Sequence, residues 1–223
     1  MKKKYKGAIF DLDGTLINSL DDLASSVNIT LRHYGFPTFS TEEYRYKVGN
    51  GAKKLIERSL PPEKARDEKF VAEALARYKE IYEAHSADAT RPYDGIIDAL
   101  KKLAEGNILL AVCTNKPEGT ARQVVAEMLG GAKFQTVVGD DGKLPIKPDP
   151  AKVNLICREL KVNPEDMIFV GDSAVDMETA VNAGCLPVGV LWGFRDSDEL
   201  KAAGAKILLE SPAELLTKVD FVL

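Results

Sequence analysis

The sequence contains few cysteine, histidine and tryptophan residues and has little net charge. Among its 223 residues are 3 cysteines, 2 histidines and 1 tryptophan, and its formal net charge is only -4. Nucleic acids and acidic membrane surfaces attract basic proteins, so this slight acidic excess argues against non-specific binding to either of them. We therefore expect no nucleic-acid partner and no membrane partner.

Long hydrophobic runs are also missing. The best apolar stretch, residues 108–113, has the length of a strand, whereas a membrane-spanning helix needs about 20 apolar residues. Near the N-terminus, Asp11 and Asp13 cut the apolar segment short, so a signal peptide is not expected. The three cysteines lie far apart in apolar contexts, which is typical of buried thiols in a reducing compartment. We predict a cytoplasmic protein.

Two hydrophobic patterns divide the chain. After residue 19 the apolar residues recur with helical spacing, as at Leu20, Leu23, Ala24, Val27 and Leu31. From about residue 91, short apolar strands alternate with helices, a pattern typical of a doubly wound parallel sheet. Because the helical block follows a first strand at residues 6–10, it interrupts the sheet domain.

These patterns predict the fold. Further strands are predicted at 108–113, 136–138, 167–170 and 187–191, with a last strand and helix after Lys206. Further helices are predicted at 41–46, 52–59, 63–85, 95–104, 118–129, 150–160 and 174–183. The predicted class is α/β, with a doubly wound, Rossmann-like parallel-sheet core (residues 1–18 and 91–223) and an inserted all-helical cap domain (residues 19–90).

Polar side chains follow three of the predicted strands. Asp11 follows the first strand, Thr114 and Asn115 follow the strand at 108–113, and Asp172 comes just after the strand at 167–170. Ligands of open α/β sheets bind outside the carboxyl ends of the strands. The three strand ends therefore predict one shared site.

Asp11 and Asp13 favour a metal ion at this site. Residues two apart in an extended segment point to the same side, so the two carboxylates would repel unless a cation lay between them. A hard ion such as Mg²⁺ would relieve the repulsion, with Asp172 as a further ligand. Gly14 permits a sharp turn that exposes N–H groups to an anion. An isolated pair of this kind is often a simple turn, but Lys147 and Asp172 together favour the metal site.

Other polar residues suit phosphate chemistry. Thr114 and Asn115 offer a hydroxyl and N–H groups just before a helix, where phosphate oxygens bind well, although they would also serve as an N-cap. Lys147 lies in a loop stiffened by two prolines, where its ammonium can balance carboxylates and steady a phosphoryl group. Asp176 follows Asp172 by about one helical turn, which suits either support of the metal site or helix capping.

These motifs resemble those of the haloacid dehalogenase superfamily, in the family's order and over essentially the whole chain. The matching segments are Asp11-Leu12-Asp13-Gly14-Thr15-Leu16, Thr114-Asn115-Lys116, Lys147-Pro148-Asp149-Pro150, and Gly171-Asp172-Ser173 with Asp176. Within the superfamily, the cap and the segments 48–52, 91–93 and 169–173 are similar to those of phosphoglycolate phosphatases. Asn18 is a small departure, because many relatives have Asp there.

The resemblance implies a Mg²⁺-dependent phosphatase. It implies that Asp11 attacks phosphorus to form an aspartyl phosphate, and that Asp13 protonates the leaving oxygen and then activates water. Mg²⁺ would be held by the carboxylates of Asp11 and Asp172 and by the backbone carbonyl of Asp13. The remaining implied roles are phosphoryl binding by Thr114, Asn115 and Lys147, and support of the metal site by Asp176.

The implied substrate is a small phosphorylated metabolite, with 2-phosphoglycolate first. Asp13 favours phosphoryl transfer over carbon–halogen cleavage, because the true dehalogenases of the superfamily lack this second Asp. A pyrophosphatase, a nucleotidase and a sugar-phosphate phosphatase or phosphomutase stay open as alternatives. A catalytically silent binding protein is a further alternative, against which the intact set of Asp11, Asp13, Lys147 and Asp172 argues.

Recognition of the rest of the substrate is assigned to the cap. The turn at Gly49 and Asn50 directly precedes a predicted helix, so its N–H groups, helped by Lys53, are expected to bind the carboxylate of phosphoglycolate. The alternative is a plain loop between two helices. His33 and His85 have no ligand partner at helical spacing, and we interpret them as surface or packing residues.

Overall fold

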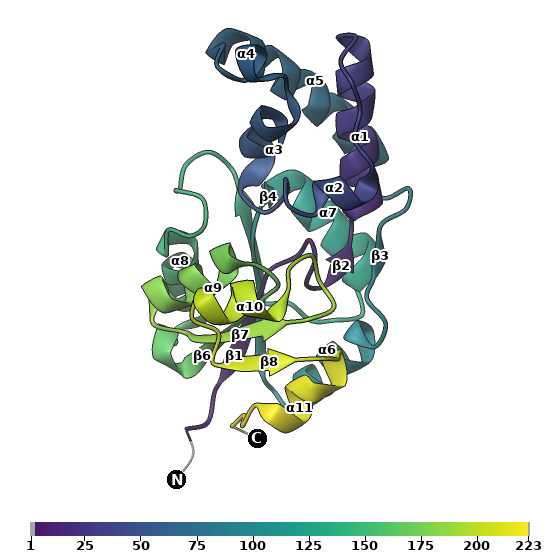
Figure 1. The fold of residues 1–223 in the computed structure, drawn as a ribbon. Coiled ribbons are helices and arrows are strands. Elements are labelled where there is room, and N and C mark those ends of the chain that lie inside the picture. Colours follow the sequence, from purple (N-terminus) through teal and green to yellow (C-terminus); the bar gives the residue numbers. More distant parts are fainter. Residues whose placement is uncertain (1–2, 223) are drawn as a thin grey trace.

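The computed structural model describes residues 3–222, so residues 1, 2 and 223 of the predicted core lie outside it (Figure 1). In the described range, one parallel sheet of six strands has the order β5-β4-β1-β6-β7-β8. The strands are β1 (Gly7–Phe10), β4 (Leu109–Pro117), β5 (Thr136–Asp140), β6 (Met167–Gly171), β7 (Leu186–Val190) and β8 (Ile207–Leu209). Since β1 lies between β4 and β6, the strand order reverses direction beside it, which is where such sheets bind ligands.

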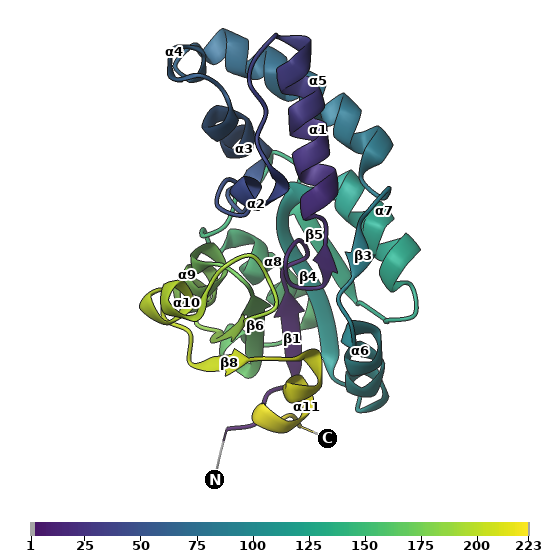
Figure 2. The same cartoon turned by 45° about the vertical axis from the view of Figure 1, so that its right-hand side comes forward.

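Helices cover both faces of the sheet (Figure 2). One face carries α6 (Ile96–Glu105), α7 (Glu118–Leu129) and α11 (Leu215–Lys218), and the other carries α8 (Ala151–Leu160) and α9 (Ala174–Ala183), which contacts α10 (Ser197–Ala202). Short 3₁₀ turns occur at Pro164–Asp166 and Pro212–Glu214. Alternate residues of β1 serve the two faces: Ala8 and Phe10 pack in one hydrophobic cluster and Ile9 in the other. The predicted α/β fold with a parallel sheet is confirmed.

Residues 19–90, called the helical segment below, pack around one hydrophobic cluster, which also takes in Phe194 from the loop after β7. The segment contains α1 (Leu20–His33), α2 (Thr41–Tyr44), α3 (Gly51–Ser59), α4 (Pro62–Ala65) and α5 (Glu68–His85). The five residues predicted to share one face of the first helix are all buried: Leu20, Leu23, Ala24, Val27 and Leu31. Both views place these helices at one end of the molecule, beyond the carboxyl ends of β1 and β4 (Figures 1 and 2).

The two ends of the helical segment lie side by side. Just outside them, β2 (Ile17–Asn18) pairs antiparallel with β3 (Arg91–Pro92). The buried carboxylate of Asp22 in α1 accepts the backbone N–H groups of Ala89 and Thr90, and the Thr90 hydroxyl donates to it at 2.6 Å. These bonds join the outgoing and returning chain. The strand pair was not predicted, because two residues are too few to show a periodicity.

Some predicted elements differ from the observed ones in extent. The helix predicted at 63–85 is divided into α4 and α5 at Asp67, whose carboxylate accepts the N–H groups of Lys69 and Phe70 and so caps α5. The strand predicted at 108–113 continues to Pro117, so Thr114 and Asn115 extend β4. Asp196 caps the short helix α10 in the same way as Asp67 caps α5, and α10 was not predicted.

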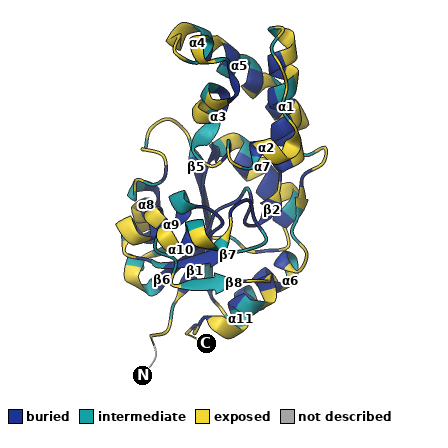
Figure 3. Ribbon diagram, in the orientation of Figure 1, coloured by how far each residue is buried: buried dark blue, intermediate teal, exposed yellow. Residues whose placement is uncertain are grey.

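Burial follows this layering (Figure 3). The central strands β1 and β6 are buried along their whole length, while α1 and α5 expose their outer faces. Cys113, Cys157 and Cys185 are buried, free thiols. Between residues 3 and 222, no helix combines the length and the apolar character that crossing a membrane requires.

Candidate active site

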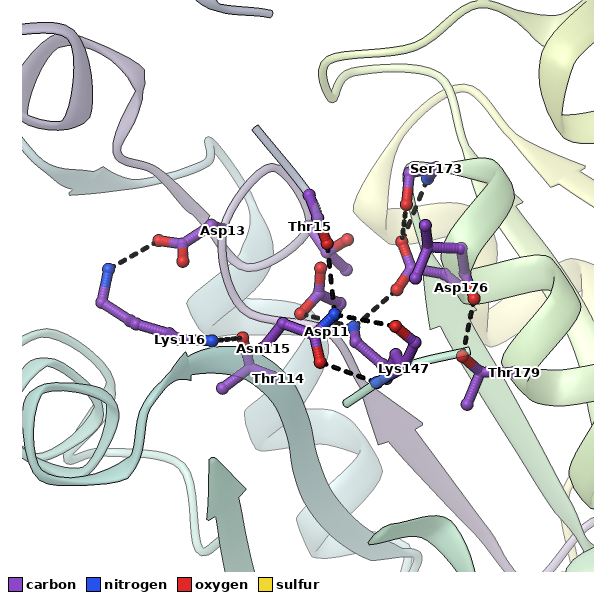
Figure 4. A network of polar contacts seen from close by, with 12 residues as sticks. Asp11, Asp13, Thr15, Thr114, Asn115, Lys116, Lys147, Ser173, Asp176 and Thr179 are labelled. Atoms are coloured by element: carbon purple, nitrogen blue, oxygen red, sulfur yellow. Dashed lines mark hydrogen bonds and ion pairs between the residues drawn. The ribbon is translucent and has the colours of Figure 1, made fainter. Parts of the chain in front are cut away.

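The carboxyl ends of β1, β4 and β6 bring the predicted residues together (Figure 4). Asp11, Thr114, Asn115 and Asp172 line one cavity between the sheet and the helical segment. The N–H of Asp11 donates to the carbonyl of Val170 at 2.9 Å, so the first residue beyond β1 is tied to the end of β6. The shared site predicted from three strand ends is thus a single place in the fold.

Three carboxylates crowd the floor of this site. Oxygens of Asp11, Asp172 and Asp176 lie within 4.8 Å of one another. Burial, reinforced by the neighbouring carboxylates, raises the pKa of Asp11 to about 6 and that of Asp172 to about 8. Asp11 Oδ1 is buried, and its near neighbour is the Lys147 ammonium rather than a backbone N–H or hydroxyl donor. Such a group of clustered, buried carboxylate oxygens fits a hard divalent cation such as Mg²⁺.

Lys147 lies against two of these carboxylates. Its Nζ donates to Asp176 Oδ1 at 2.6 Å and lies 2.9 Å from Asp11 Oδ1, there without the alignment of a hydrogen bond. Burial by itself would lower the pKa of Lys147, but the charges of Asp11 and Asp176 outweigh burial and raise it. The ammonium therefore stays charged and offsets part of the negative charge on the floor.

Asn115 holds the loop that presents Lys147. Its side-chain oxygen accepts the Lys147 N–H at 2.8 Å, and its amide nitrogen donates to the Lys147 carbonyl at 3.1 Å and to the Gly49 carbonyl at 3.3 Å. The side chain thus joins β4, the lysine loop and the helical segment. Contact of Asn115 and Thr114 with a phosphoryl group stays a prediction.

The Asp172 carboxylate is held by the turn that follows β1 and by the loop that follows β7. Its oxygens accept the N–H of Phe194 at 2.8 Å and the hydroxyl of Thr15 at 3.1 Å. A Cβ on Gly14 would lie 2.4 Å from Asp172 Oδ2, and a Cβ on Gly193 would lie 2.3 Å from Asp172 Cβ. Glycine at both positions allows this close approach, and Gly14 also has a positive φ of 88°.

Asp13 points to a different part of the cavity from Asp11. Its carboxylate is not in the group of three; it accepts the Ser19 hydroxyl at 2.6 Å and the Lys116 ammonium at 2.8 Å (Figure 4). The rule for extended residues two apart does not apply, because β1 ends at Phe10 and the chain turns at once. The expected crowding of the Asp11 and Asp13 carboxylates is replaced by an Asp13–Lys116 ion pair. The backbone carbonyl of Asp13 as a metal ligand stays a prediction.

The helical segment supplies the opposite wall of the cavity. Gly49 lines it together with Leu23, Leu55, Tyr78 and Tyr82. The two other predicted recognition residues do not: Asn50 accepts a hydrogen bond from Arg58, and the Lys53 side chain is 62% exposed, 3.8 Å from Glu57. Substrate recognition by this turn stays a prediction, and of the three residues only Gly49 lines the cavity.

Sequence reasoning missed two cations of this cavity, Lys116 and Arg195. Lys116 had a recognisable signal, because it follows Thr114 and Asn115 at the end of an apolar strand. Arg195 had none, since its partners in the helical segment are about 150 positions away and only folding brings them near. The two histidines lie apart from the cavity; His33 packs edge-on to Tyr34, and His85 contacts Asp88.

Known proteins resemble the chain in both sequence and fold. Residues 8–190 match the family described as haloacid dehalogenase-like hydrolase. The phosphoglycolate phosphatase 1 of Pseudomonas aeruginosa is 34% identical over 95% of this chain and 79% of the relative. The phosphoglycolate phosphatase of Haemophilus influenzae (strain 86-028NP) is 33% identical over 97% of this chain and 99% of the relative.

Among solved structures, CbbY of Rhodobacter sphaeroides in complex with xylulose-(1,5)bisphosphate has a TM-score of 0.80 at 26% identity, covering 97% of this chain and 100% of the other. The family match spans the sheet and the helical segment alike, and it includes Asp11, Asp13, Lys147 and Asp172. The resemblance predicted from the motifs is therefore confirmed, and the chain belongs to the haloacid dehalogenase-like hydrolase family.

Proposed function

We propose that this protein is a Mg²⁺-dependent phosphatase that hydrolyses a small phosphate monoester, 2-phosphoglycolate first, through an aspartyl phosphate on Asp11. The observation that carries the proposal is the arrangement of two carboxylates with different partners. Asp11 lies among buried carboxylates and beside Lys147, whereas Asp13 is paired with Ser19 and Lys116. Nucleophile and proton donor are thus separate groups at one site.

Asp11 is suited to attack phosphorus. Lys147, whose side chain is buried behind Asp11 and is not among the residues that line the cavity, favours the ionised form of Asp11. An Asp11 oxygen would form the bond to phosphorus as the bond from phosphorus to the ester oxygen breaks, giving the aspartyl phosphate and an alkoxide. A Mg²⁺ ion held by Asp11, Asp172 and the Asp13 carbonyl, with Asp176 behind it, would neutralise negative charge on the phosphoryl oxygens.

Asp13 is placed to move the protons. Asp13 must carry a proton when the first step begins; it would donate that proton to the leaving alkoxide and then accept one from the water that attacks the aspartyl phosphate. Phosphate leaves and Asp11 is regenerated, so the two steps balance. Ser19 and Lys116 orient the Asp13 carboxylate for both transfers.

The helical segment is proposed to act as a cap. Its side chains already wall the cavity, and closure over the sheet would keep bulk water from the aspartyl phosphate. The free, buried thiols agree with the reducing cytoplasm as the place of action.

The first test is phosphate release from 2-phosphoglycolate with Mg²⁺ and with EDTA, beside pyrophosphate, ribose 5-phosphate, glucose phosphates and AMP. We expect Mg²⁺-dependent hydrolysis that favours phosphoglycolate. Asp11→Asn keeps the size of the side chain and should abolish turnover while leaving thermal unfolding cooperative. Turnover by this variant close to that of the parent chain would contradict the proposed nucleophile.

A sugar-phosphate substrate is the second candidate. The observation that favours it is the fold likeness to CbbY bound to xylulose-(1,5)bisphosphate. Preference for a sugar phosphate in the same assay would keep the mechanism and change the substrate. Conversion of one sugar phosphate to its isomer, without release of phosphate, would identify a mutase.

A further inference from the structure

Lys116 is a buried ammonium on the wall of the cavity. Its side chain is only 2% exposed, and its Nζ contacts the Asp13 carboxylate, at 2.8 Å, and the hydroxyl of Tyr82. The lysine comes from β4 and the tyrosine from α5, so the pair bridges the sheet and the helical segment. An ammonium has three donors, and these two contacts account for two of them.

The other cations near the cavity are committed elsewhere. Lys147 is held by Asp11 and Asp176 on the floor. The Arg195 guanidinium donates to the carbonyls of Arg45 and Val48 and pairs with Glu199 at 3.3 Å. Among the described residues that line the cavity, Lys116 is the cation placed beside the proposed proton donor.

The positions of the two lysines give the site two positive ends. Figure 4 shows Asp11 between them, with Lys147 on the side of Asp176 and Lys116 on the side of Asp13. Phosphorus must lie next to Asp11, and the leaving oxygen must lie next to Asp13, which protonates it. Lys116 therefore lies on the side of the leaving group, beyond the bond that breaks.

We infer that Lys116 and Tyr82 form the subsite for a carboxylate carried by the leaving group; this inference rests on the proposed phosphatase function. In 2-phosphoglycolate one methylene separates the ester oxygen from the carboxylate, so a carboxylate falls within a few ångströms of Asp13. There the ammonium and the phenol can both donate to it, as a charge-assisted pair of hydrogen bonds. When an ester without that carboxylate binds, the buried ammonium has no substrate group to pair with, so the site disfavours such an ester.

Tyr82 is suited to this role because its hydroxyl keeps its proton. Burial, together with the charges of Asp13 and Asp22, raises the pKa of Tyr82 well above its usual value. Tyr78 stacks on it with ring centroids 5.5 Å apart, and this contact holds the ring in place. Since Tyr82 belongs to the helical segment, carboxylate binding would also favour the closed arrangement.

The test compares two esters that differ in the carboxylate, 2-phosphoglycolate and ethyl phosphate. For Lys116→Met we expect the ratio of their kcat/KM values to fall about 10- to 100-fold, as for the loss of a hydrogen bond to a charged group. Tyr82→Phe should lower the same ratio by roughly tenfold, and it keeps the test decisive if Lys116→Met does not fold. Lys54→Met removes an exposed lysine of α3 and should leave the ratio unchanged.

A parallel fall for both esters would overturn the inference, because Lys116 would then serve Asp13 alone. A ratio lost in Lys53→Met and kept in Lys116→Met would overturn the inference in favour of the turn at Gly49.

A binding experiment separates this inference from the proposed function. With Mg²⁺ present, calorimetry should show that phosphonoacetate binds more tightly than methylphosphonate, and that this difference is lost in Lys116→Met. That result in a protein that hydrolyses no ester would refute the phosphatase and keep the subsite. Equal binding of the two phosphonates by the parent chain would refute the subsite.

Discussion

Arg45 of the helical segment and Arg195 of the sheet domain each bind the backbone of the other's loop. Arg45 donates to the carbonyls of Gly193, at 3.0 Å, and Phe194, at 3.2 Å. Arg195 donates to the carbonyl of Arg45 and to that of Val48, the latter at 3.0 Å. The same loop supplies the Phe194 N–H that holds Asp172, so the position of the helical segment is linked to a proposed metal ligand.

This reciprocal contact predicts the behaviour of Arg45→Met. The variant loses two charge-assisted hydrogen bonds of about 1.5–3 kcal/mol each in a buried setting. Since the Arg45 side chain is 34% exposed, solvent screening reduces that figure, and we expect kcat/KM to fall about 5- to 20-fold. Hydrogen exchange of the Phe194 amide should become faster. Arg122→Met, at an exposed arginine of α7, is the matched control. Equal kinetics for the two variants would contradict the proposed link between the Arg45–Arg195 contact and the position of Asp172.

Gly14 is predicted to be irreplaceable for a steric reason. In Gly14→Ala the new Cβ meets the Asp172 carboxylate at 2.4 Å, in addition to a φ of 88° that L-residues disfavour. Gly35 has a similar φ of 72°, but a Cβ there has nothing within 4 Å. We expect Gly35→Ala to cost about 1 kcal/mol of unfolding free energy with normal turnover. Gly14→Ala should lose more stability and at least about 100-fold in kcat, since Asp172 must move. Urea unfolding and steady-state kinetics give both values, and equal effects would refute the steric argument.

The buried lysines Lys147 and Lys152 offer another matched pair. Lys147 contacts Asp11 and Asp176, whereas Lys152 donates to the carbonyl of Thr114 at 3.1 Å. Lys147→Met removes a preorganised positive charge from the reacting groups, so we expect kcat to fall about 100- to 1000-fold or more. Lys152→Met should lower stability and keep kcat within roughly threefold, because Asp11 and Asp13 keep their contacts and Thr114 loses a partner only at its backbone carbonyl. A comparable loss of kcat in both variants would contradict a specific role for the Lys147 charge beside Asp11, because removal of either buried lysine would then have the same effect.

The clustered carboxylates of Asp11, Asp172 and Asp176 predict how the free energy of unfolding depends on pH in the absence of metal. Asp172 has a folded-state pKa of about 8, well above the value of about 3.9 for an unfolded chain, and Asp11 is shifted in the same direction. Between these values the folded chain binds more protons than the unfolded chain, so the free energy of unfolding falls as pH rises from about 4 to 8. Added Mg²⁺ should reverse the loss at pH 8, because the cation binds the ionised carboxylates.

Denaturant unfolding in EDTA at pH 5, 6.5 and 8 measures this dependence. Asp172→Asn should flatten it, since the asparagine has no proton to lose. Stability that rises across this range in EDTA would contradict the crowding of the three carboxylates.

The linear chain contains much of the information about the floor of the site. Apolar strands followed by Asp11, by Thr114 and by Asp172 are local patterns, and parallel strands necessarily place their carboxyl ends at one edge. The helical face of α1 could be predicted for the same reason, because periodic burial leaves a periodic sequence. Capping residues such as Asp67 and Asp196 are local signals too, so the break before α5 and the helix α10 were open to prediction.

The sequence by itself therefore determined the order of the main strands and helices along the chain, the acidic residues at the strand ends, and Lys147 in its proline-containing loop, because these depend on neighbours in the chain. Tertiary structure alone decided which partner each charge meets. Asp13 turns from Asp11 to Lys116, Tyr82 reaches that lysine from α5, and Arg195 meets Val48 across 147 positions. Such pairings depend on where the helical segment packs on the sheet, and no local periodicity records the distance between residues so far apart in the chain.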